Sequence, residues 1–482
     1  MTRLPLLVCS LLLGSTAALL LSMNGCSGAS SSHFHQSQQV QHIVLIVQEN
    51  RSTDNLFQGL CIPPTGSASA CGTGQNQYNI ASSGLSTTSS TPIPLQPLDL
   101  GTNGSNPDYY DLSHAHSAFV SMYNGGQMNG ANLIPVTCDA GTTNCPPPNL
   151  PANPQYMYVN PSDAAPYIQM AQTYAFGDNM FQTNQGPSFP AHQFIFGGTS
   201  APTATSDLFA SSNVSPGPTA GCIAPPGSIV NLIDPSGSES QTMYPCFEHQ
   251  TMGDLLDAAN VTWRYYAPGA GSIWTAPDAI NHICQAQTQN GQLVCTGSDW
   301  TANVSLPPNG GSAQVLSDIV NRQLPEVSWV IPTGQESDHA ATNDGSGPSW
   351  VTSVVNAIGN SPYWANTVIF VVWDDWGGWY DHVAPTIINS YEYGFRVPVI
   401  VISPYAKAAY ISHNMHNFGS ILKFIEETYG LPSLNYADAD SDDFSDCFNF
   451  SQTPLTFQPI SAPLTAEHFI NDRRPPTDPD DD

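Results

Sequence analysis

The feature that most constrains the fold is a pair of uninterrupted apolar segments, at residues 42–48 (HIVLIVQ) and 367–373 (TVIFVVW). Continuous β-branched runs of this kind are typical of strands buried on both faces of a parallel sheet. Segments with helical periodicity alternate with further apolar segments. We expect helices at 167–181, 252–259, 315–322, 350–358 and 420–429, and strands at 261–267, 326–331 and 397–403. Repeated helix–strand units predict an α/β fold with a mostly parallel central sheet and helices on both faces.

The charge balance restricts the possible partners. The chain has 482 residues, with 9 Lys+Arg against 38 Asp+Glu and a net charge of −29. This balance argues against binding nucleic acid or an anionic membrane surface through a basic patch. The acidity fits activity at low pH, and it equally fits the general acidity of exported proteins.

The N-terminal segment predicts export. A short basic start and an apolar run are typical of a removable signal peptide, which we expect at residues 1–25, followed by a linker at 26–41. The alternative is a retained anchor, because the run is close to the length of a spanning helix. Cys26 follows Gly25 as in a lipoprotein cleavage box, but Met23 departs from that box, so lipid anchoring stays open. No transmembrane segment is expected in the mature chain.

Cysteine spacing agrees with export. Eight cysteines fall into close neighbours, namely Cys61 and Cys71, Cys138 and Cys145, Cys222 and Cys246, and Cys284 and Cys295. Local disulfides in an oxidising compartment explain this spacing, although sequence alone leaves the connectivity open. Cys447 is left over and is expected to be a buried free thiol.

The rest of the chain is organised around one domain, expected at residues 42–472. Residues 60–160 and 200–246 are rich in Gly, Ser, Asn and Pro and are expected to form long ordered loops. The Pro- and Asp-rich tail at 473–482 is expected to be disordered.

Acidic and amide side chains follow directly after the two strongest strands. Glu49 and Asn50 follow the first strand, and Asp374 and Asp375 follow the strand at 367–373. In a parallel sheet both ends lie on the carboxyl edge, where α/β proteins bind their ligands. These oxygen donors suit a divalent cation such as Mg²⁺, Ca²⁺ or Mn²⁺, and carboxylate sites also accept Zn²⁺. The alternative is that each pair caps a helix or forms a turn.

Four motifs resemble one bacterial enzyme family. They are Val47-Gln-Glu-Asn-Arg-Ser52, Gly186-Pro-Ser-Phe-Pro190, Trp373-Asp-Asp-Trp-Gly-Gly-Trp-Tyr-Asp-His-Val383 and Gly394-Phe-Arg-Val-Pro398. Together they resemble the phospholipase C and acid phosphatase family of the alkaline phosphatase superfamily. The resemblance implies an alkaline-phosphatase-like fold, a bound divalent metal ion of unknown identity and a Ser or Thr nucleophile.

The resemblance also implies site residues. The implied metal ligands are Glu49, Asn50, Ser188, Asp374 and Asp375, and Ser188 is also the implied nucleophile. We expect its hydroxyl to lie exposed in a Gly/Pro turn.

Histidines fill the remaining roles. His114, His339 and His282 resemble family histidines that bind phosphate oxygens or protonate the leaving group, although the residues after His282 depart from the family pattern. His382 and Arg396 are expected to orient the loop that carries the aspartates. The histidines expected to be structural are His116, His192, His413 and His416.

The predicted function is therefore the hydrolysis of a phosphoester by an exported enzyme. Motifs of serine esterases, zincins and P-loop proteins are absent from the sequence. The sequence leaves open whether the substrate is a phosphomonoester or a phospholipid, and it leaves the oligomeric state open. The alternative is an exported protein that keeps the fold for binding without catalysis.

Overall fold

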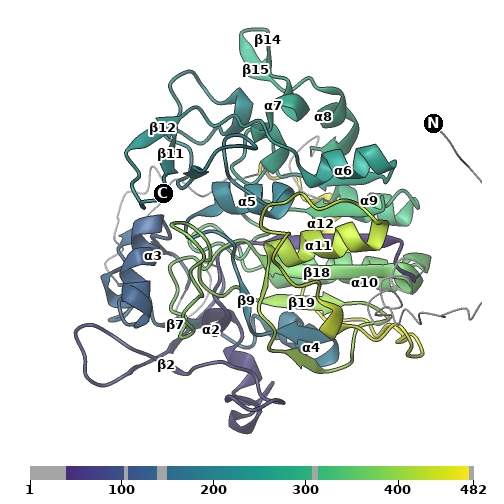
Figure 1. Ribbon diagram of the computed structural model, residues 1–482. Coiled ribbons are helices and arrows are strands. Elements are labelled where there is room, and N and C mark those ends of the chain that lie inside the picture. Colours follow the sequence, from purple (N-terminus) through teal and green to yellow (C-terminus); the bar gives the residue numbers. More distant parts are fainter. Residues whose placement is uncertain (1–38, 102–106, 138–148, 307–312, 477–482) are drawn as a thin grey trace, which may run out of the picture.

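The computed structural model describes residues 39–101, 107–137, 149–306 and 313–476. Its centre is an eight-stranded sheet with the strand order β16-β13-β17-β1-β18-β19-β8-β20 (Figure 1). The strands are β16 (Val304–Ser305), β13 (Trp263–Tyr266), β17 (Val327–Val330), β1 (His42–Gln48), β18 (Thr367–Trp373), β19 (Val399–Ile402), β8 (Ala175–Gly177) and β20 (Tyr410–Ser412). Every strand except β19 runs in the same direction. The prediction of a mostly parallel α/β sheet is confirmed.

Helices form two groups on opposite faces of this sheet (Figure 1). In one group α10 (Gly347–Gly359) contacts α4 (Ala165–Thr173), α9 (Gln314–Val320) and α12 (Ala466–Asn471). In the other group α5 (Ser188–Gly197) contacts α6 (Met252–Ala259) and α11 (Phe418–Tyr429). Strands covered on both faces must be apolar throughout, which explains the continuous apolar runs of β1 and β18.

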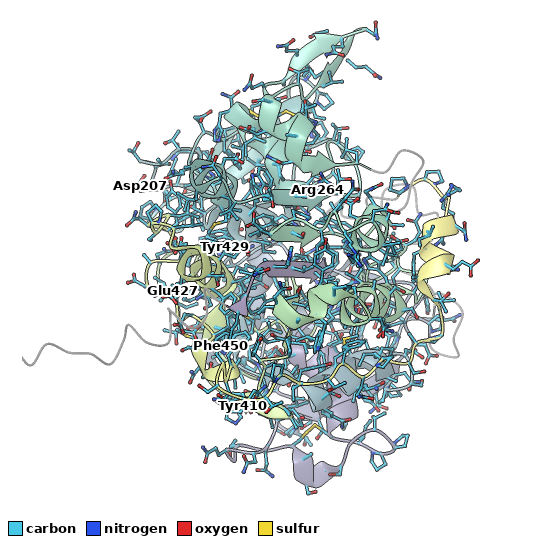
Figure 2. All side chains as sticks on the ribbon, turned by 90° about the vertical axis from the view of Figure 1, so that its right-hand side faces the viewer. Asp207, Arg264, Tyr410, Glu427, Tyr429 and Phe450 are labelled. Carbon is cyan, nitrogen blue, oxygen red and sulfur yellow. A yellow bond between two sulfur atoms is a disulfide. The ribbon has the colours of Figure 1, made fainter. Side chains whose placement is uncertain are left out.

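The sheet edges differ from its buried centre. Arg264 on β13 and Tyr410 on β20 lie toward opposite ends of the strand order (Figure 2). Arg264 reaches the carboxylate of Asp318 on α9, at 2.6 Å. Tyr410 donates its hydroxyl hydrogen to Asp446. These polar contacts contrast with the central strands β1 and β18, in which every residue except His42 is buried.

One local prediction differs from the structure. The helical pattern expected at 167–181 ends at Thr173, because Tyr174 is extended and the next residues form β8 and then β9 (Met180–Phe181). β8 is paired on both sides, by β19 and β20, so sheet pairing overrides the local pattern. The described residues of the segment at 60–160 form loops with few elements, as expected, and include one α-helix, α3 (His116–Tyr123).

Cysteines behave as expected where the structure describes them. Disulfides join Cys61 to Cys71, Cys222 to Cys246, and Cys284 to Cys295, and Cys447 is a buried free thiol. The predicted signal peptide, Cys26, the Cys138 and Cys145 pair and residues 477–482 lie outside the described residues. Across the described ranges, no helix has the length and apolarity needed to cross a membrane.

Candidate active site

Strand register brings the two acidic segments together. Gln48, the last residue of β1, pairs with Trp373, the last residue of β18. The backbone N–H of Asp374 then donates to the carbonyl oxygen of Gln48, at 3.0 Å. Glu49 and Asp374 therefore leave the sheet side by side at its carboxyl edge, and both are fully buried.

The backbone at Asn50 turns sharply away from the sheet. Asn50 has a positive φ of 59°, a left-handed conformation that asparagine tolerates better than most residues. Its N–H donates to Asp374 Oδ1 at 3.1 Å, which ties the two strand ends together. A Cβ atom at Gly377 would lie 2.3 Å from the carbonyl oxygen of Asn50, so only glycine permits this approach of the loop after Asp375.

Ser188 comes to the site from a helix. It is the first residue of α5, where Pro190 fits because the first turn of a helix needs few backbone donors. The Ser188 hydroxyl lies 3.3 Å from Asp375 Oδ2. Ser188 is fully buried, so the expectation of an exposed hydroxyl in a turn is wrong; the Gly/Pro segment leads directly into a helix that packs against the sheet.

His114 and His339 both point at the side chain of Asn50. Their Nε2 atoms lie 3.0 and 3.2 Å from the same end of the Asn50 amide. Their Nδ1 atoms lie 2.9 Å from the carbonyl oxygen of Leu112 and 2.8 Å from that of Ala340. A carbonyl oxygen only accepts, so Nδ1 carries the hydrogen in each ring, and in the neutral ring Nε2 is an acceptor.

This arrangement decides which way the Asn50 amide points. When both rings are neutral, the two Nε2 acceptors call for the NH₂ group of Asn50, and its oxygen faces Asp374 Oδ1 at 3.1 Å and Glu49 Oε2 at 3.3 Å; when the rings are protonated, the amide turns over and donates to these two carboxylates. Three oxygen atoms facing one another repel unless a cation lies among them. Asp374 Oδ2 is buried and accepts no hydrogen bond from the described residues. The donor set of Glu49, Asn50 and Asp374 therefore fits a divalent cation.

His192, which the sequence analysis treated as structural, also reaches this cluster. Its Nε2 lies 3.2 Å from Glu49 Oε1 and 3.8 Å from Asp374 Oδ2. It is located on α5 four residues after Ser188, hence on the same face of the helix. That spacing was the available sequence signal, but it required knowing that residue 188 begins a helix.

Arg396 and His382 lie in a neighbouring ionic cluster. Arg396 pairs with Asp381 through Nε, at 2.8 Å, and with Asp54 through Nη2, at 3.1 Å. His382 Nδ1 lies 2.6 Å from Asp54 Oδ2. Burial raises the pKa of Asp381, and the Arg396 charge opposes that rise. These contacts link the segment after Asp375 to the segment after Arg51.

The structure does not bring His282 into the cluster. Its Nδ1 lies 2.7 Å from Glu248 and its Nε2 lies 2.9 Å from Asp254, so both ring nitrogens face carboxylates of other segments. The hydrogen bond with Asp254 raises the pKa of His282 to about 9. The expected catalytic role of His282 came from a partial motif, and the local fold uses this histidine to join two surface helices.

Asp338 supports the site from behind and was not singled out in the sequence. Its Oδ2 accepts from the Tyr167 hydroxyl at 2.9 Å and from Trp373 Nε1 at 3.0 Å. Its backbone N–H donates to Gln48 Oε1 at 2.9 Å. Burial raises the pKa of Asp338 to about 6. These bonds fix the chain at the residue before His339.

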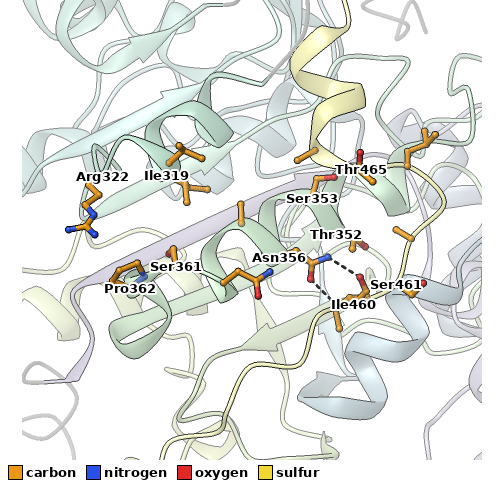
Figure 3. A pocket seen from close by; sticks show the side chains of 16 residues that line it. Ile319, Arg322, Thr352, Ser353, Asn356, Ser361, Pro362, Ile460, Ser461 and Thr465 are labelled. Carbon is orange, nitrogen blue, oxygen red and sulfur yellow. Dashed lines mark hydrogen bonds between the residues drawn. The ribbon is translucent and has the colours of Figure 1, made fainter.

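A surface cavity of about 680 Å³ lies apart from these residues (Figure 3). It is lined by α9, α10 and the segment at 460–466, and none of the predicted site residues lines it. Asn356 spans part of it with two hydrogen bonds to the backbone of Ile460, at 2.8 and 2.9 Å. The cavity marks where the C-terminal segment packs on α10.

Comparison with known proteins supports the phosphoesterase prediction. The Phosphoesterase family model matches residues 40–432. The chain is 24% identical to hemolytic phospholipase C of Pseudomonas aeruginosa over 444 residues, which cover 83% of this chain and 54% of that protein. It is 27% identical to phospholipase C A of Mycobacterium tuberculosis over 458 residues, covering 88% and 80% of the two chains. The chain thus spans about half the length of the Pseudomonas relative and most of the mycobacterial one.

A solved structure gives a weaker match. A Vibrio parahaemolyticus protein of the alkaline phosphatase superfamily is 11% identical, with a TM-score of 0.34 over 58% of this chain and 63% of that chain. This overlap is too small to define the fold by itself. The α/β fold and the buried acidic site agree with the family match. The chain belongs to the Phosphoesterase family.

Proposed function

We propose that this chain is an exported, metal-dependent phosphoester hydrolase in which Ser188 is the nucleophile. The observation that carries the proposal is the position of the Ser188 hydroxyl, 3.3 Å from Asp375 in a cluster with Glu49 and Asp374. All three carboxylates are fully buried. Burying several carboxylates is costly unless positive charge compensates them, and a bound cation would supply that charge.

Glu49, Asn50, Asp374 and Asp375 are the residues that would hold the cation. A divalent cation in this place would lower the pKa of a nearby hydroxyl and neutralise charge on phosphoryl oxygens. His114 and His339 hold the Asn50 amide oxygen toward the carboxylates through the hydrogen bonds described above.

The chain's own groups supply the proton path. Ser188 Oγ attacks phosphorus, and its hydrogen leaves along the hydrogen bond to Asp375 Oδ2. His114 Nε2 lies 3.9 Å from the same Asp375 oxygen, so a bridging water would carry this proton to the ring, which would release its bond with Asn50 and protonate the departing alkoxide. The bond from phosphorus to the alkoxide oxygen breaks as the serine ester forms. Water then hydrolyses the phosphoserine.

The relatives support one class of substrate in particular. Two relatives named phospholipase C support a phospholipid headgroup ester, and a phosphomonoester stays open. Three disulfides support an oxidising compartment and hence export.

A substrate panel tests the proposal. Turnover of p-nitrophenylphosphorylcholine and p-nitrophenyl phosphate would be measured at acid and neutral pH, with and without a chelator. We expect turnover of at least one substrate, lost with chelator and restored by added dications. Metal binding without turnover of either substrate would overturn the catalytic proposal and favour a non-catalytic exported binding protein.

A further inference from the structure

His192 has a fixed hydrogen at Nδ1. The Tyr265 hydroxyl lies 3.3 Å from His192 Nδ1 and donates its single hydrogen to the carbonyl oxygen of Trp274, at 2.7 Å. Because that carbonyl only accepts, the phenol oxygen can serve His192 only as an acceptor. The hydrogen between the two side chains therefore belongs to His192 Nδ1.

The opposite nitrogen faces the acidic cluster. His192 Nε2 lies 3.2 Å from Glu49 Oε1 and 3.8 Å from Asp374 Oδ2, and a ring that carries its only hydrogen at Nδ1 would present the Nε2 lone pair to a cation between them. Asp374 Oδ2 is buried and receives no hydrogen bond from the described part of the chain. The three ligand atoms lie within 4.8 Å of one another. A nitrogen lone pair and carboxylate oxygens that converge in this way are the donor set of a metal site.

Two other histidine–acid clusters in the described residues have a further protein group beside the histidine. Beside His382, the guanidinium of Arg396 pairs with Asp381. Beside His416, the Ser412 hydroxyl lies 2.8 Å from His416 Nε2 and 2.6 Å from Asp446 Oδ2. In contrast, Asp374 Oδ2 accepts no hydrogen bond from the described residues.

Positive charge from arginine is also committed elsewhere. The described residues contain two buried arginines, Arg51 and Arg396. Arg51 pairs with Asp108, and Arg396 pairs with Asp54 and Asp381. Neither arginine is paired with Glu49 or Asp374, so positive charge at these carboxylates comes from a protonated His192 ring or from a bound ion.

We propose that His192 Nε2 is a direct ligand of the cation at Glu49 and Asp374, with Tyr265 as the residue that orients its ring. This inference rests on the proposed function and narrows the identity of the metal. An imidazole ligand favours transition-metal dications such as Zn²⁺, Co²⁺ or Mn²⁺ over Mg²⁺ and Ca²⁺, which prefer oxygen donors throughout. One face of α5 then carries both the nucleophile and a metal ligand.

Metal binding to the metal-stripped full chain tests the inference without measuring turnover. Binding of Co²⁺ and of Mg²⁺ would be measured by calorimetric titration, and Co²⁺ binding also by visible absorption. Co²⁺ should bind more tightly than Mg²⁺, and its absorption spectrum should be that of a site with a nitrogen ligand. His192→Ala should lower Co²⁺ affinity by more than about 100-fold and change the spectrum. Tyr265→Phe removes the acceptor for Nδ1, together with the hydroxyl's bond to the Trp274 carbonyl, and should lower Co²⁺ affinity by about 10- to 100-fold.

Matched controls separate these effects from unfolding. Tyr266→Phe removes a buried hydroxyl that donates to Asp318, and His413→Ala removes a histidine that pairs with Asp178. Both should bind Co²⁺ like the wild type, and the thermal unfolding midpoint of each metal-free variant reports its folding.

The outcomes distinguish this inference from the proposed function. If folded His192→Ala and Tyr265→Phe keep wild-type Co²⁺ affinity and spectrum while Asp374→Asn loses binding, His192 is not a ligand and the proposed function stands. Tighter binding of Mg²⁺ than of Co²⁺ or Zn²⁺ would also overturn the inference alone. A wild-type chain that binds no dication would overturn both.

Discussion

Ser188 and His192 lie one helical turn apart on α5, and each contacts a different carboxylate of the same cluster. Ser188 Oγ is 3.3 Å from Asp375, and His192 Nε2 is 3.2 Å from Glu49. The carboxylates come from the residues that follow β1 and β18, and the serine and histidine that contact them come from one face of α5. Changes on that face should affect chemistry and metal binding separately.

Ser188→Ala should reduce turnover by at least about three orders of magnitude, or about 4 kcal/mol of transition-state stabilisation, because it deletes the nucleophile. The thermal unfolding midpoint should stay close to the wild-type value, since one hydroxyl is removed and no apolar cavity opens. Acid quenching during turnover should trap phosphate on the wild-type peptide that contains Ser188. Ser200→Ala, which removes another buried hydroxyl, is the control. A Ser188→Ala enzyme within about tenfold of wild type would place the nucleophile elsewhere.

Asp374→Asn and Asp375→Asn should each lower the bound metal content, because an amide is a weaker ligand and leaves the ion's charge less compensated. Elemental analysis of dialysed protein measures this loss, and activity should fall with it. Asp318→Asn changes a buried aspartate that pairs with Arg264, outside the site, and should keep full metal content. Normal metal content in both site variants would contradict the proposed ligand set.

Arg396→Met should destabilise the fold by about 3–5 kcal/mol, because it leaves Asp54 and Asp381 buried without their counter-charge. Urea unfolding at neutral pH measures the change. Arg474 pairs with Asp472 at the surface, where its side chain is 44% exposed. Arg474→Met should therefore cost no more than about 1 kcal/mol. Equal effects of the two substitutions would refute the role of burial.

His282 should make folding stability depend on pH. The bond with Asp254 raises the pKa of His282 to about 9 from its ordinary value of 6.5, so the folded state holds the proton more tightly than the unfolded state does. The stabilisation is complete below about pH 6.5 and is lost as the pH rises through about 9. Urea unfolding of wild type and His282→Asn at pH 6, 8 and 10 should show a difference that shrinks with rising pH. A difference independent of pH would disprove this linkage.

The strands and their acidic ends could be predicted from the sequence because their signals are local. A continuous apolar run such as residues 43–47 of β1 is typical of a buried strand, and the residues after such a strand must lie at the sheet edge. The direction of β19 could not be predicted in this way. Its apolar run resembles that of a parallel strand, and only the path of the chain from Asp375 back to Val399 makes it antiparallel.

The histidines show where local signals end. His192 gave no signal of its own, because its partners Glu49 and Tyr265 come from distant segments that only the folded sheet brings close. His282 shows the reverse case. A partial motif predicted a catalytic role for this histidine, whereas in the structure its ring nitrogens contact the carboxylates of Glu248 and Asp254, away from the acidic cluster. Helix orientation is a tertiary property, so short motifs do not determine which helix face meets the sheet.

The pairing of Gln48 with Trp373 has a consequence for engineering this chain. Glu49 and Asp374 are positioned by backbone bonds between two central strands, and the long connecting segments at 60–160 and 200–246 do not set that spacing. Apart from His114 and the residues that position it, those segments could be shortened, exchanged between relatives or selected for new substrates while the acidic pair keeps its separation. A deletion of one residue inside β18 would instead turn Asp374 toward the other face of the sheet. The acidic cluster would then be lost even though every connecting segment is unchanged.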